Sequence, residues 1–359
     1  MAEVIGEQVA EGISLQELQL AARNHAMPLE ALRYPITPIG LHYLLIHYDV
    51  PVVDPAGWRL RVGGHVEREL TFGLEELRER PRAELTVTME CAGNGRAHLE
   101  PRPQSQPWLL EAVGTGRWGG TPLRPLLEEA LLRDDAVEVL FTGLDRGVEK
   151  GVEQLFQRSL RLEEALRDEV LLAYEMNGAP LPPQHGFPLR LVVPGWYGMT
   201  NVKWLAAIEV LDRPFDGYQQ SWAYRLRQSE DEGGVPLDRM RPRSLLIPPG
   251  MPDFHTRERI LDAGEHVLEG RAWSGRAPVA AVEVSTDGGE SWAEAELRPE
   301  EGPWAWRGWR FPWRAEPGLR LISSRARDEA GNEQPLEPAW NLGGYANNAV
   351  QTVVVTVTG

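Results

Sequence analysis

Cysteine is nearly absent from this sequence, which contains one, Cys91, among 359 residues. One thiol cannot form an intramolecular disulfide, a four-cysteine zinc site or an iron–sulfur cluster, and it cannot attach haem through C-x-x-C-H. Long apolar runs are missing too, since no segment approaches the roughly 18–20 residues of a membrane-spanning helix. The composition therefore predicts a chain that folds on an ordinary hydrophobic core and does not enter a membrane.

Basic residues are the scarcer charged class. The chain has 37 Lys and Arg against 53 Asp and Glu, a formal net charge of −16 at pH 7. This balance argues against a nucleic-acid partner, because phosphate contacts need a basic surface. The first 20 residues are acidic and amphipathic, unlike a secretory or twin-arginine leader. They predict a cytoplasmic protein, or a periplasmic one if a leader was removed.

Several enzyme motifs are also absent. The sequence has no G-x-x-x-x-G-K-[ST] phosphate loop, no H-E-x-x-H zinc helix, no G-x-S-x-G elbow and no G-x-G-x-x-G opening a helix. Residues 285–292 resemble the Asp-box turn of sialidase propellers, but a single copy is typical of a hairpin tip. These absences exclude the common signatures of nucleotide, zinc and serine-hydrolase chemistry.

The pattern along the chain divides it into three parts. Residues 1–40 predict a helix over 14–26, with Ser14 as its N-cap, and then a proline-rich loop. Residues 41–240 mix strands with short helices, which predicts an α+β catalytic domain. Residues 241–359 contain short strands about ten residues apart, separated by turn residues, and predict an all-β immunoglobulin-like sandwich.

Individual elements follow from apolar periods of 3.6 and 2. Residues 225–243 are polar and predict an exposed segment. The expected helices are 74–80, 122–132 and 160–166, and the expected strands are 58–62, 84–89, 137–142, 170–174, 189–193, 204–211, 261–272, 279–285, 292–297, 304–313, 319–328 and 350–357.

Cys91 is the residue that suggests a chemistry. A lone cysteine is usually buried and inert, but this one ends an alternating strand and precedes Ala-Gly-Asn-Gly, where backbone can approach a ligand closely. Arg96 follows five residues later and favours the thiolate. A single soft thiolate suits a metal that brings most of its own ligands. Basic residues beside glycine and proline turns at 185–190 and 198–204 are candidates for the phosphate of such a cofactor.

These segments together closely resemble the sulfite oxidase family of molybdenum enzymes. The family's T-x-x-C-A-G-N is matched at 88–94, and further blocks between 172 and 205 follow in the family's order and spacing. The end of the chain, W-N-L-G-G at 340–344, resembles the family's immunoglobulin-like dimerisation domain. The resemblance covers about residues 40–359 and implies a molybdopterin-binding catalytic domain, a dimerisation domain and a homodimer.

The resemblance also implies roles for individual residues. Cys91 would be the one protein ligand of molybdenum. Arg96 would receive the substrate oxyanion, Tyr224 would hydrogen-bond near the reacting oxygen, and Trp108 would line the pocket. Six residues would hold the pterin and its phosphate: His47, Asp145, His185, Arg190, Asn201 and Lys203.

Two departures from the family pattern concern the substrate. The arginine of the R-N-H motif of animal and plant members is replaced by Leu45, and the arginine of W-N-L-R-G is replaced by Gly343. A charge-assisted hydrogen bond contributes about 1.5–3 kcal/mol, so the loss of two weakens sulfite binding by orders of magnitude unless other groups replace them. The resemblance therefore supports the cofactor more strongly than the substrate.

The implied activity is oxygen-atom transfer at molybdenum, in which sulfite or a related sulfur compound is oxidised. The electrons would pass to an external carrier such as a cytochrome, because no haem is expected and the family's cytochrome b5 domain is not in the sequence. The same scaffold can run in reverse as an S-oxide or N-oxide reductase, or act on another sulfur compound. A non-catalytic interaction protein, in which Cys91 is inert, is the remaining alternative.

Overall fold

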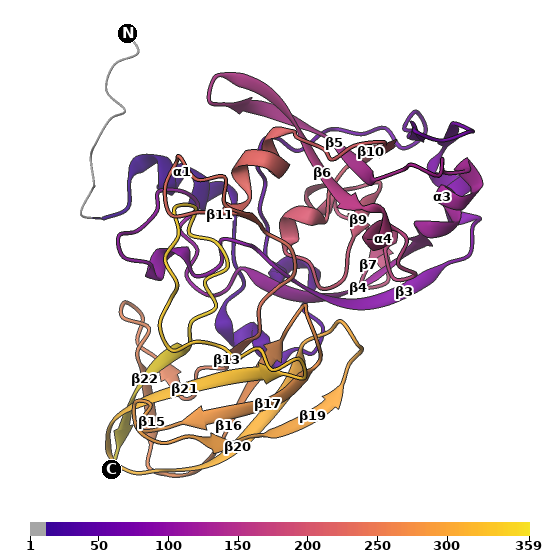
Figure 1. Ribbon diagram of the computed structural model, residues 1–359. Helices are drawn as coiled ribbons and strands as arrows, with labels where there is room; N and C mark the ends of the chain where they lie inside the picture. The colour runs from indigo at the N-terminus through magenta and orange to yellow at the C-terminus, as the bar shows by residue number, and fades with distance from the viewer. Residues whose placement is uncertain (1–11) are drawn as a thin grey trace.

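The structure, a computed structural model that describes residues 12–359, consists of two lobes that pack side by side (Figure 1). The larger lobe contains strands and short helices, and the smaller lobe, orange to yellow in Figure 1, is built from strands. This order confirms the predicted α+β domain followed by an all-β sandwich. Residues 1–11 of the expected N-terminal segment lie outside the described residues. From residue 12 onward, no helix is long and apolar enough to cross a membrane.

The N-terminal helix begins at its predicted cap. In α1 (Leu15–Arg23), Ser14 and Glu17 form a capping box: the Ser14 hydroxyl accepts from the Glu17 amide (3.2 Å), and the Glu17 carboxylate accepts from the Ser14 amide (2.9 Å). The helix ends earlier than predicted, because Asn24 has extended backbone and its side chain caps the last turn. Two 3₁₀ turns follow in the proline-rich loop, η1 (Leu29–Arg33) and η2 (Ile39–Leu41).

A five-stranded sheet of order β2-β1-β10-β5-β6 forms one part of the larger lobe. Strands β1 and β10 are parallel, and the other pairs are antiparallel. Three of these strands and all three short helices of this lobe match predictions, whereas β2 and β6 are additional. The bounds are β1 (Leu60–Gly64), β2 (Leu70–Phe72), β5 (Glu138–Glu149), β6 (Val152–Arg161), β10 (Leu205–Leu211), α2 (Leu74–Arg78), α3 (Arg124–Ala130) and α4 (Leu162–Ala165).

A second sheet of order β3-β4-β7-β8, with β9 beside β7, positions Cys91 at the end of β3. Strand β4 escapes prediction because its glycines interrupt the alternating pattern. Close packing requires two of them: a Cβ on Gly114 would lie 2.6 Å from the His42 ring, and one on Gly120 would lie 2.1 Å from the Leu172 carbonyl oxygen. The bounds are β3 (Ala83–Glu90), β4 (Val113–Pro122), β7 (Leu171–Met176), β8 (Ala179–Pro180) and β9 (Arg190–Val192).

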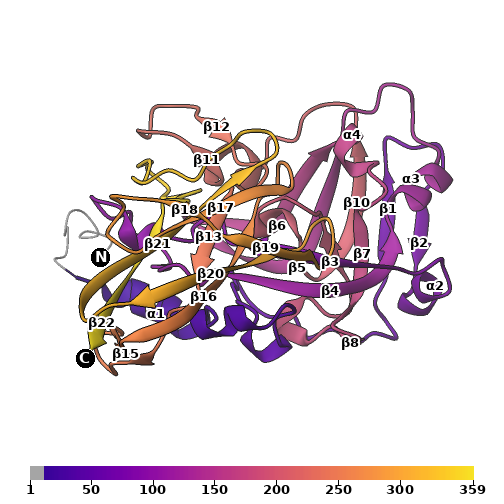
Figure 2. The same cartoon turned by 90° about the horizontal axis from the view of Figure 1, so that it is seen from below.

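The smaller lobe is a sandwich of two sheets, of order β13-β16-β20-β19 and β14-β15-β22-β21-β17-β18 (Figure 2). Their facing sides enclose a separate apolar core that includes Trp309, Ile322 and Val355. The strand predicted at 261–272 is two strands. The regular strand conformation is interrupted between Asp262 and Gly264, and Gly264 has a φ of +141°. The bounds are β13 (Arg243–Leu246), β14 (Met251–Pro252), β15 (Arg259–Asp262), β16 (Gly264–Trp273), β17 (Val279–Ser285), β18 (Ala293–Glu294), β19 (Glu296–Glu300), β20 (Arg307–Ala315), β21 (Gly318–Asp328) and β22 (Gln351–Thr358).

The segment 225–243 is exposed over only part of its length. A small hairpin of β11 (Arg225–Leu226) and β12 (Val235–Pro236) lies at the surface, but Met240 and Arg243 are buried where the lobes meet. The Met240 amide donates to a carbonyl of the larger lobe, and its own carbonyl accepts from the smaller lobe. The prediction of an exposed segment is therefore wrong for its second half, because these residues bridge the two lobes.

Candidate active site

Cys91 begins a tight loop that continues strand β3. Its amide donates to the Ala112 carbonyl (2.9 Å), and its carbonyl accepts from the Asn94 amide (2.9 Å). The turn is completed by Gly95 in the left-handed region, with φ +88°. This geometry holds the thiol close to the backbone of the loop, as the glycines after Cys91 suggest.

The Cys91 loop is anchored from behind by a buried polar network. Glu90 accepts hydrogen bonds from the Asn94 amide group (3.0 Å), the Trp273 indole (2.9 Å) and the Arg243 guanidinium. Arg243 begins the smaller lobe, and both it and Glu90 are almost fully buried. This ion pair therefore fixes the Cys91 loop to the smaller lobe.

The C-terminal segment 341–347 also holds this loop. The Ala346 amide donates to the Ala92 carbonyl (2.7 Å), and the Asn347 side chain donates to the Gly95 carbonyl (2.8 Å). Residues about 250 positions apart in the sequence thus form one surface around Cys91.

Burial raises the pKa of the Cys91 thiol, although the Arg96 charge and a hydrogen bond from the Gly93 amide act in the opposite direction. As expected from the sequence, the Arg96 charge acts to lower the pKa of Cys91. Burial of the thiol raises that pKa by more, so the net shift is upward.

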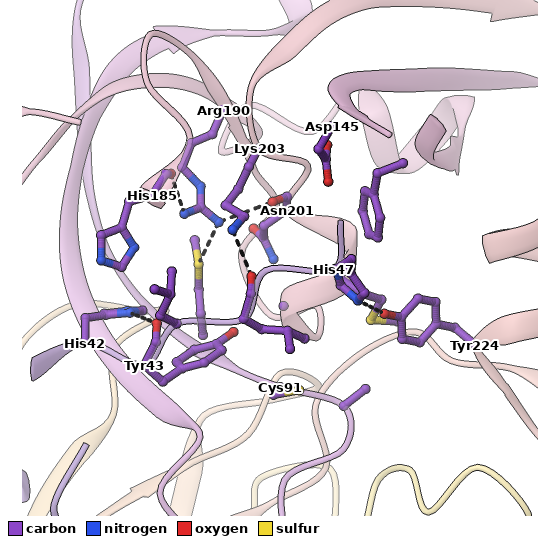
Figure 3. Close-up of a pocket in the computed structure, with 17 residues that line it drawn as sticks. His42, Tyr43, His47, Cys91, Asp145, His185, Arg190, Asn201, Lys203 and Tyr224 are labelled. Atoms are coloured by element: carbon purple, nitrogen blue, oxygen red, sulfur yellow. Dashed lines mark hydrogen bonds between the residues drawn. The ribbon is translucent and has the colours of Figure 1, made fainter. Parts of the chain in front are cut away.

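A cavity lies directly beside Cys91 (Figure 3). All six predicted cofactor-binding residues line it, together with Cys91 and Tyr224: His47, Asp145, His185, Arg190, Asn201 and Lys203. They come from segments spread between residues 47 and 224, which the two sheets of the larger lobe bring together. We call this space the inner cavity.

Two cations, the buried Arg190 and the partly buried Lys203, dominate the far side of the inner cavity (Figure 3). The Arg190 guanidinium donates to the carbonyls of His185 (3.0 Å) and Asn201 (3.2 Å), and the Lys203 ammonium donates to those of Leu45 (2.8 Å) and Gln184 (3.2 Å). Within residues 12–359, no carboxylate forms an ion pair with either cation. Burial lowers the pKa of Arg190 to about 10 and also lowers the pKa of Lys203.

Neutral imidazoles and one carboxyl group complete the inner cavity. Burial lowers the pKa of His185 to about 2, of His47 to about 3 and of His42 to about 4. Burial raises the pKa of Asp145, against the attraction of Lys203. One atom each of His42, Asp145 and Arg190 (Nε2, Oδ1 and Nε) is buried without a hydrogen-bond partner.

This arrangement fits an anionic, polar cofactor. Buried charges without counter-ions are costly, and a bound phosphate would offset the charges of Arg190 and Lys203. The unpartnered carboxyl oxygen of Asp145 is suited to accept from a ring N–H. Asn201 contributes differently, because its side chain accepts from the Val193 amide (2.7 Å) and donates to a backbone carbonyl, while its own carbonyl orients Arg190.

A second, open cavity meets the inner one at Cys91. Its volume is about 610 Å³, and it shares Leu45, His47, Cys91, Phe156 and Tyr224 with the inner cavity. Both remaining predicted site residues, Arg96 and Trp108, line this outer cavity. The structure thus brings all ten predicted site residues to one connected space, with Cys91 where its two halves join.

Arg96 lies in the wall of the outer cavity rather than projecting into it. Its guanidinium donates to the carbonyls of Gly343 (2.9 Å) and Gln106 (2.9 Å), and it packs 5.1 Å from the centre of the Tyr345 ring. Only 4% of Arg96 is exposed. The one family arginine that is present is therefore already partly occupied by backbone carbonyls.

Tyr224 follows a π-helical turn, η6 (Gln219–Ala223), at the boundary of the two cavities. Its hydroxyl is hydrogen-bonded to His47 Nε2. The Arg158 guanidinium lies 5.6 Å from the centre of the Tyr224 ring, and it donates to the Gln219 carbonyl. Burial raises the pKa of Tyr224 well above its usual value, while Arg158 acts to lower it.

Sequence reasoning misses four residues near this site: His42, Tyr43, Arg158 and Tyr345. His42 and Tyr43 line the inner cavity, and Tyr345 lines the outer one. A signal exists for Arg158, because it alternates with the buried Phe156 and Leu160 along β6. An arginine in an apolar register of a strand indicates a buried charge with a specific role.

Comparison with known proteins identifies both lobes. Residues 47–219 match the model of the oxidoreductase molybdopterin binding domain, and residues 251–358 match the Mo-co oxidoreductase dimerisation domain. The first match indicates a molybdenum–molybdopterin cofactor, and the second supports a homodimer.

Relatives with known names agree with these domains. Mitochondrial sulfite oxidase of Mus musculus is 37% identical over 341 residues, covering 90% of this chain and 62% of that protein. Sulfite oxidase of Gallus gallus is 35% identical, covering 88% of this chain and 72% of the relative. Nitrate reductase [NADH] 1 of Arabidopsis thaliana is 33% identical over 90% of this chain and 39% of that protein. The chain thus spans about three-fifths of the length of the mouse relative.

A solved structure matches the whole chain. The sulfane dehydrogenase SoxCD from Paracoccus pantotrophus superposes with a TM-score of 0.81 at 27% identity, covering 100% of this chain and 96% of that one. These matches favour an enzyme over a non-catalytic interaction protein. This chain belongs to the sulfite oxidase family of molybdopterin-dependent oxidoreductases.

Proposed function

We propose that this chain oxidises a reduced sulfur compound by two electrons, using a bound molybdenum–molybdopterin cofactor and passing the electrons to an external carrier. The observation that carries the proposal is the position of Cys91. It lies where a cavity walled by cations that have no ion-pair partner among the described residues joins an open cavity that a substrate can enter. For sulfite as substrate, sulfite and water would give sulfate, two protons and two electrons.

The residues of the inner cavity would hold the cofactor. Cys91 would bind the metal as a thiolate, and Arg190, Lys203 and His185 would bind the terminal phosphate. Asp145 and His47 would contact the pterin. When bound, the cofactor supplies the two-electron redox chemistry and the transferable oxygen, which no side chain of this chain can provide.

The residues of the outer cavity would orient the substrate. Arg96 adds positive charge from the wall, and its bonds to two backbone carbonyls fix its position. Tyr224 would donate a hydrogen bond from its hydroxyl to a substrate oxygen or sulfur, with His47 Nε2 donating to that hydroxyl and orienting it. The buried side chain of Trp108 limits water near the reacting atoms.

The outer cavity supports a sulfur compound whose reacting group carries less negative charge than sulfite. Leu45 and Gly343 supply no charge, and Arg96 is partly occupied by carbonyls. The other cations that line this cavity are also engaged: Arg102 pairs with Glu17, Arg225 donates to two backbone carbonyls, and Lys150 and Arg227 lie over the Trp222 ring. The outer cavity, with a volume of about 610 Å³, exceeds what a four-atom anion needs. The structural relative named as a sulfane dehydrogenase is consistent with such a substrate. We therefore rank a sulfane sulfur compound, such as a persulfide, with or above free sulfite.

The test begins with molybdenum and pterin content per protomer, measured on protein produced in a host that makes the cofactor. Initial rates with sulfite and with glutathione persulfide follow, using a dye as electron acceptor. We expect about one molybdenum and one pterin per chain, and turnover of at least one substrate. Well-folded protein without pterin would refute the proposal, as would full activity of Cys91→Ser.

A second candidate is the reverse reaction, reduction of an S-oxide or N-oxide. The replacement of two arginines by Leu45 and Gly343 favours it, because a neutral oxide needs no oxyanion site. Consumption of reduced viologen with dimethyl sulfoxide, against dye reduction with the sulfur compounds above, distinguishes the two directions.

A further inference from the structure

Gly343 lies in a hydrogen-bonded turn that places Tyr345 close to it. Residues 341–345 form a closed turn, in which the Asn341 side chain accepts from the Tyr345 amide (2.9 Å) and donates to the Tyr345 carbonyl (2.8 Å). The Gly344 amide also donates to the Asn341 carbonyl (2.9 Å), and φ of Gly344 is +61°. The turn therefore sets the direction of the Tyr345 side chain.

Tyr345 occupies the space that a side chain at position 343 would need. A Cβ built on Gly343 would lie 2.2 Å from Cε2 and 2.5 Å from Cδ2 of the Tyr345 ring. Contacts this short do not occur between real atoms, so an arginine at 343 and the observed ring position exclude each other. Both residues line the outer cavity, where a family arginine is expected from the W-N-L-R-G pattern.

The Tyr345 ring also makes contacts that join it to the rest of the site. The ring lies between Arg96 and Tyr224. The guanidinium carbon of Arg96 is 5.1 Å from the centre of the Tyr345 ring, and the centres of the Tyr345 and Tyr224 rings are 5.4 Å apart. The Arg96 Nε donates to the carbonyl of Gly343 itself (2.9 Å). The missing arginine is thus replaced by a neutral phenol that packs between the two predicted substrate-contacting residues.

We propose that Tyr345 is a specificity-determining residue, whose ring takes the place of a guanidinium at position 343 and shifts the outer cavity from doubly charged oxyanions to sulfur compounds whose reacting group carries at most one negative charge. The inference rests on the proposed function for the reaction itself. A phenol can donate one hydrogen bond but adds no charge, whereas a guanidinium would add charge and paired donors. The preference for a persulfide over sulfite then follows from the presence of a phenol where a guanidinium would otherwise lie.

The experiment exchanges the two residue types, alone and together. The variants are Gly343→Arg, Tyr345→Ala and the double variant Gly343→Arg/Tyr345→Ala, all compared with the unchanged holoenzyme. Binding of inorganic sulfate is measured by calorimetry, since it needs no turnover. Molybdenum content and the KM for sulfite and glutathione persulfide are measured on the same preparations.

We expect the double variant to bind sulfate about 10- to 100-fold more tightly than the unchanged enzyme, because it gains a charge-assisted contact. Its KM for sulfite should fall by a similar factor, with little change for the persulfide. Gly343→Arg alone should gain less, because the ring still fills the space. Tyr345→Ala alone should not gain sulfate affinity.

Two results would overturn the inference. One is a double variant that keeps its molybdenum but binds sulfate no better than the unchanged enzyme. The other is equal sulfate affinity in Gly343→Arg and the double variant, which would mean that Tyr345 does not compete for the space. If sulfate binding changes as expected but no variant oxidises either sulfur compound, the proposed function fails while this inference stands.

Discussion

Glu90→Gln should destabilise the protein strongly and should disturb the Cys91 loop. The substitution keeps the shape of Glu90 but removes the charge that faces Arg243, and it points an amide donor at groups that are themselves donors. Removing one partner of a buried ion pair costs about 3–5 kcal/mol, because the other charge stays buried and uncompensated. We expect that loss in the free energy of unfolding. We also expect a lower molybdenum content, because the one amide oxygen cannot accept from Asn94 and Arg243 and also from Trp273, so the network that shapes the loop is incomplete.

Urea unfolding measures the first effect, and elemental analysis of molybdenum per protomer measures the second. The matched control is Glu84→Gln on the same strand, whose carboxylate pairs with Arg82 and is 40% exposed. An exposed pair contributes about 0–1 kcal/mol, so the control should change little. If Glu90→Gln costs no more than Glu84→Gln, the buried network does not anchor the lobes, and the reasoning is refuted.

Three further predictions concern the cavities. Lys203→Met should lower pterin content yet stabilise the cofactor-free protein by about 1 kcal/mol or more in urea, because it removes a desolvated cation that has no ion-pair partner among residues 12–359; lower stability would contradict this. Arg158→Met should reduce kcat/KM about 2- to 30-fold through loss of the cation beside Tyr224, and Arg158→Lys should retain most activity; equal losses would indicate a packing role only. His42 has a folded pKa of about 4 against 6.5 unfolded, so unfolding takes up a proton below pH 6.5. His42 therefore does not affect the free energy of unfolding above pH 6.5. Between pH 6.5 and about pH 4 it lowers the free energy of unfolding by about 1.4 kcal/mol for each unit of pH decrease. His42→Gln should reduce this slope, measured by urea unfolding at several pH values.

The fold could be predicted where periodicity or capping is local. The Ser14 capping box and the alternation that ends at Cys91 lie within a few residues, so the sequence alone indicates the helix and strand β3. Strand β4 could not be predicted in this way. Its glycines are present because His42 and the Leu172 carbonyl approach them from other segments, and such approaches appear only in the folded chain.

The site could be predicted to a different degree for its two cavities. The residues of the inner cavity lie in motifs with fixed order and spacing, and each predicted member lines that cavity, although their roles toward a cofactor stay predictions. Tyr345 and Arg158 do not belong to such motifs. The role proposed for Tyr345 depends on its contact with Gly343 across a turn, and the role proposed for Arg158 depends on its contact with Tyr224, which is distant in the sequence. Only the structure reveals these two contacts.

The return of the C-terminal segment to the Cys91 loop has a consequence for biosynthesis. Ribosomes synthesise the chain from its N-terminus, so Cys91 and every inner-cavity residue emerge well before Gly343, Ala346 and Asn347. Until those last residues arrive, the carbonyls of Ala92 and Gly95 and the guanidinium of Arg96 lack the partners that shape the loop. The Cys91 thiol is therefore fixed in place only after residues 343–347 have been made. We expect cofactor insertion to follow the synthesis of these residues, because a chain that lacks them would present an unformed loop to the cofactor.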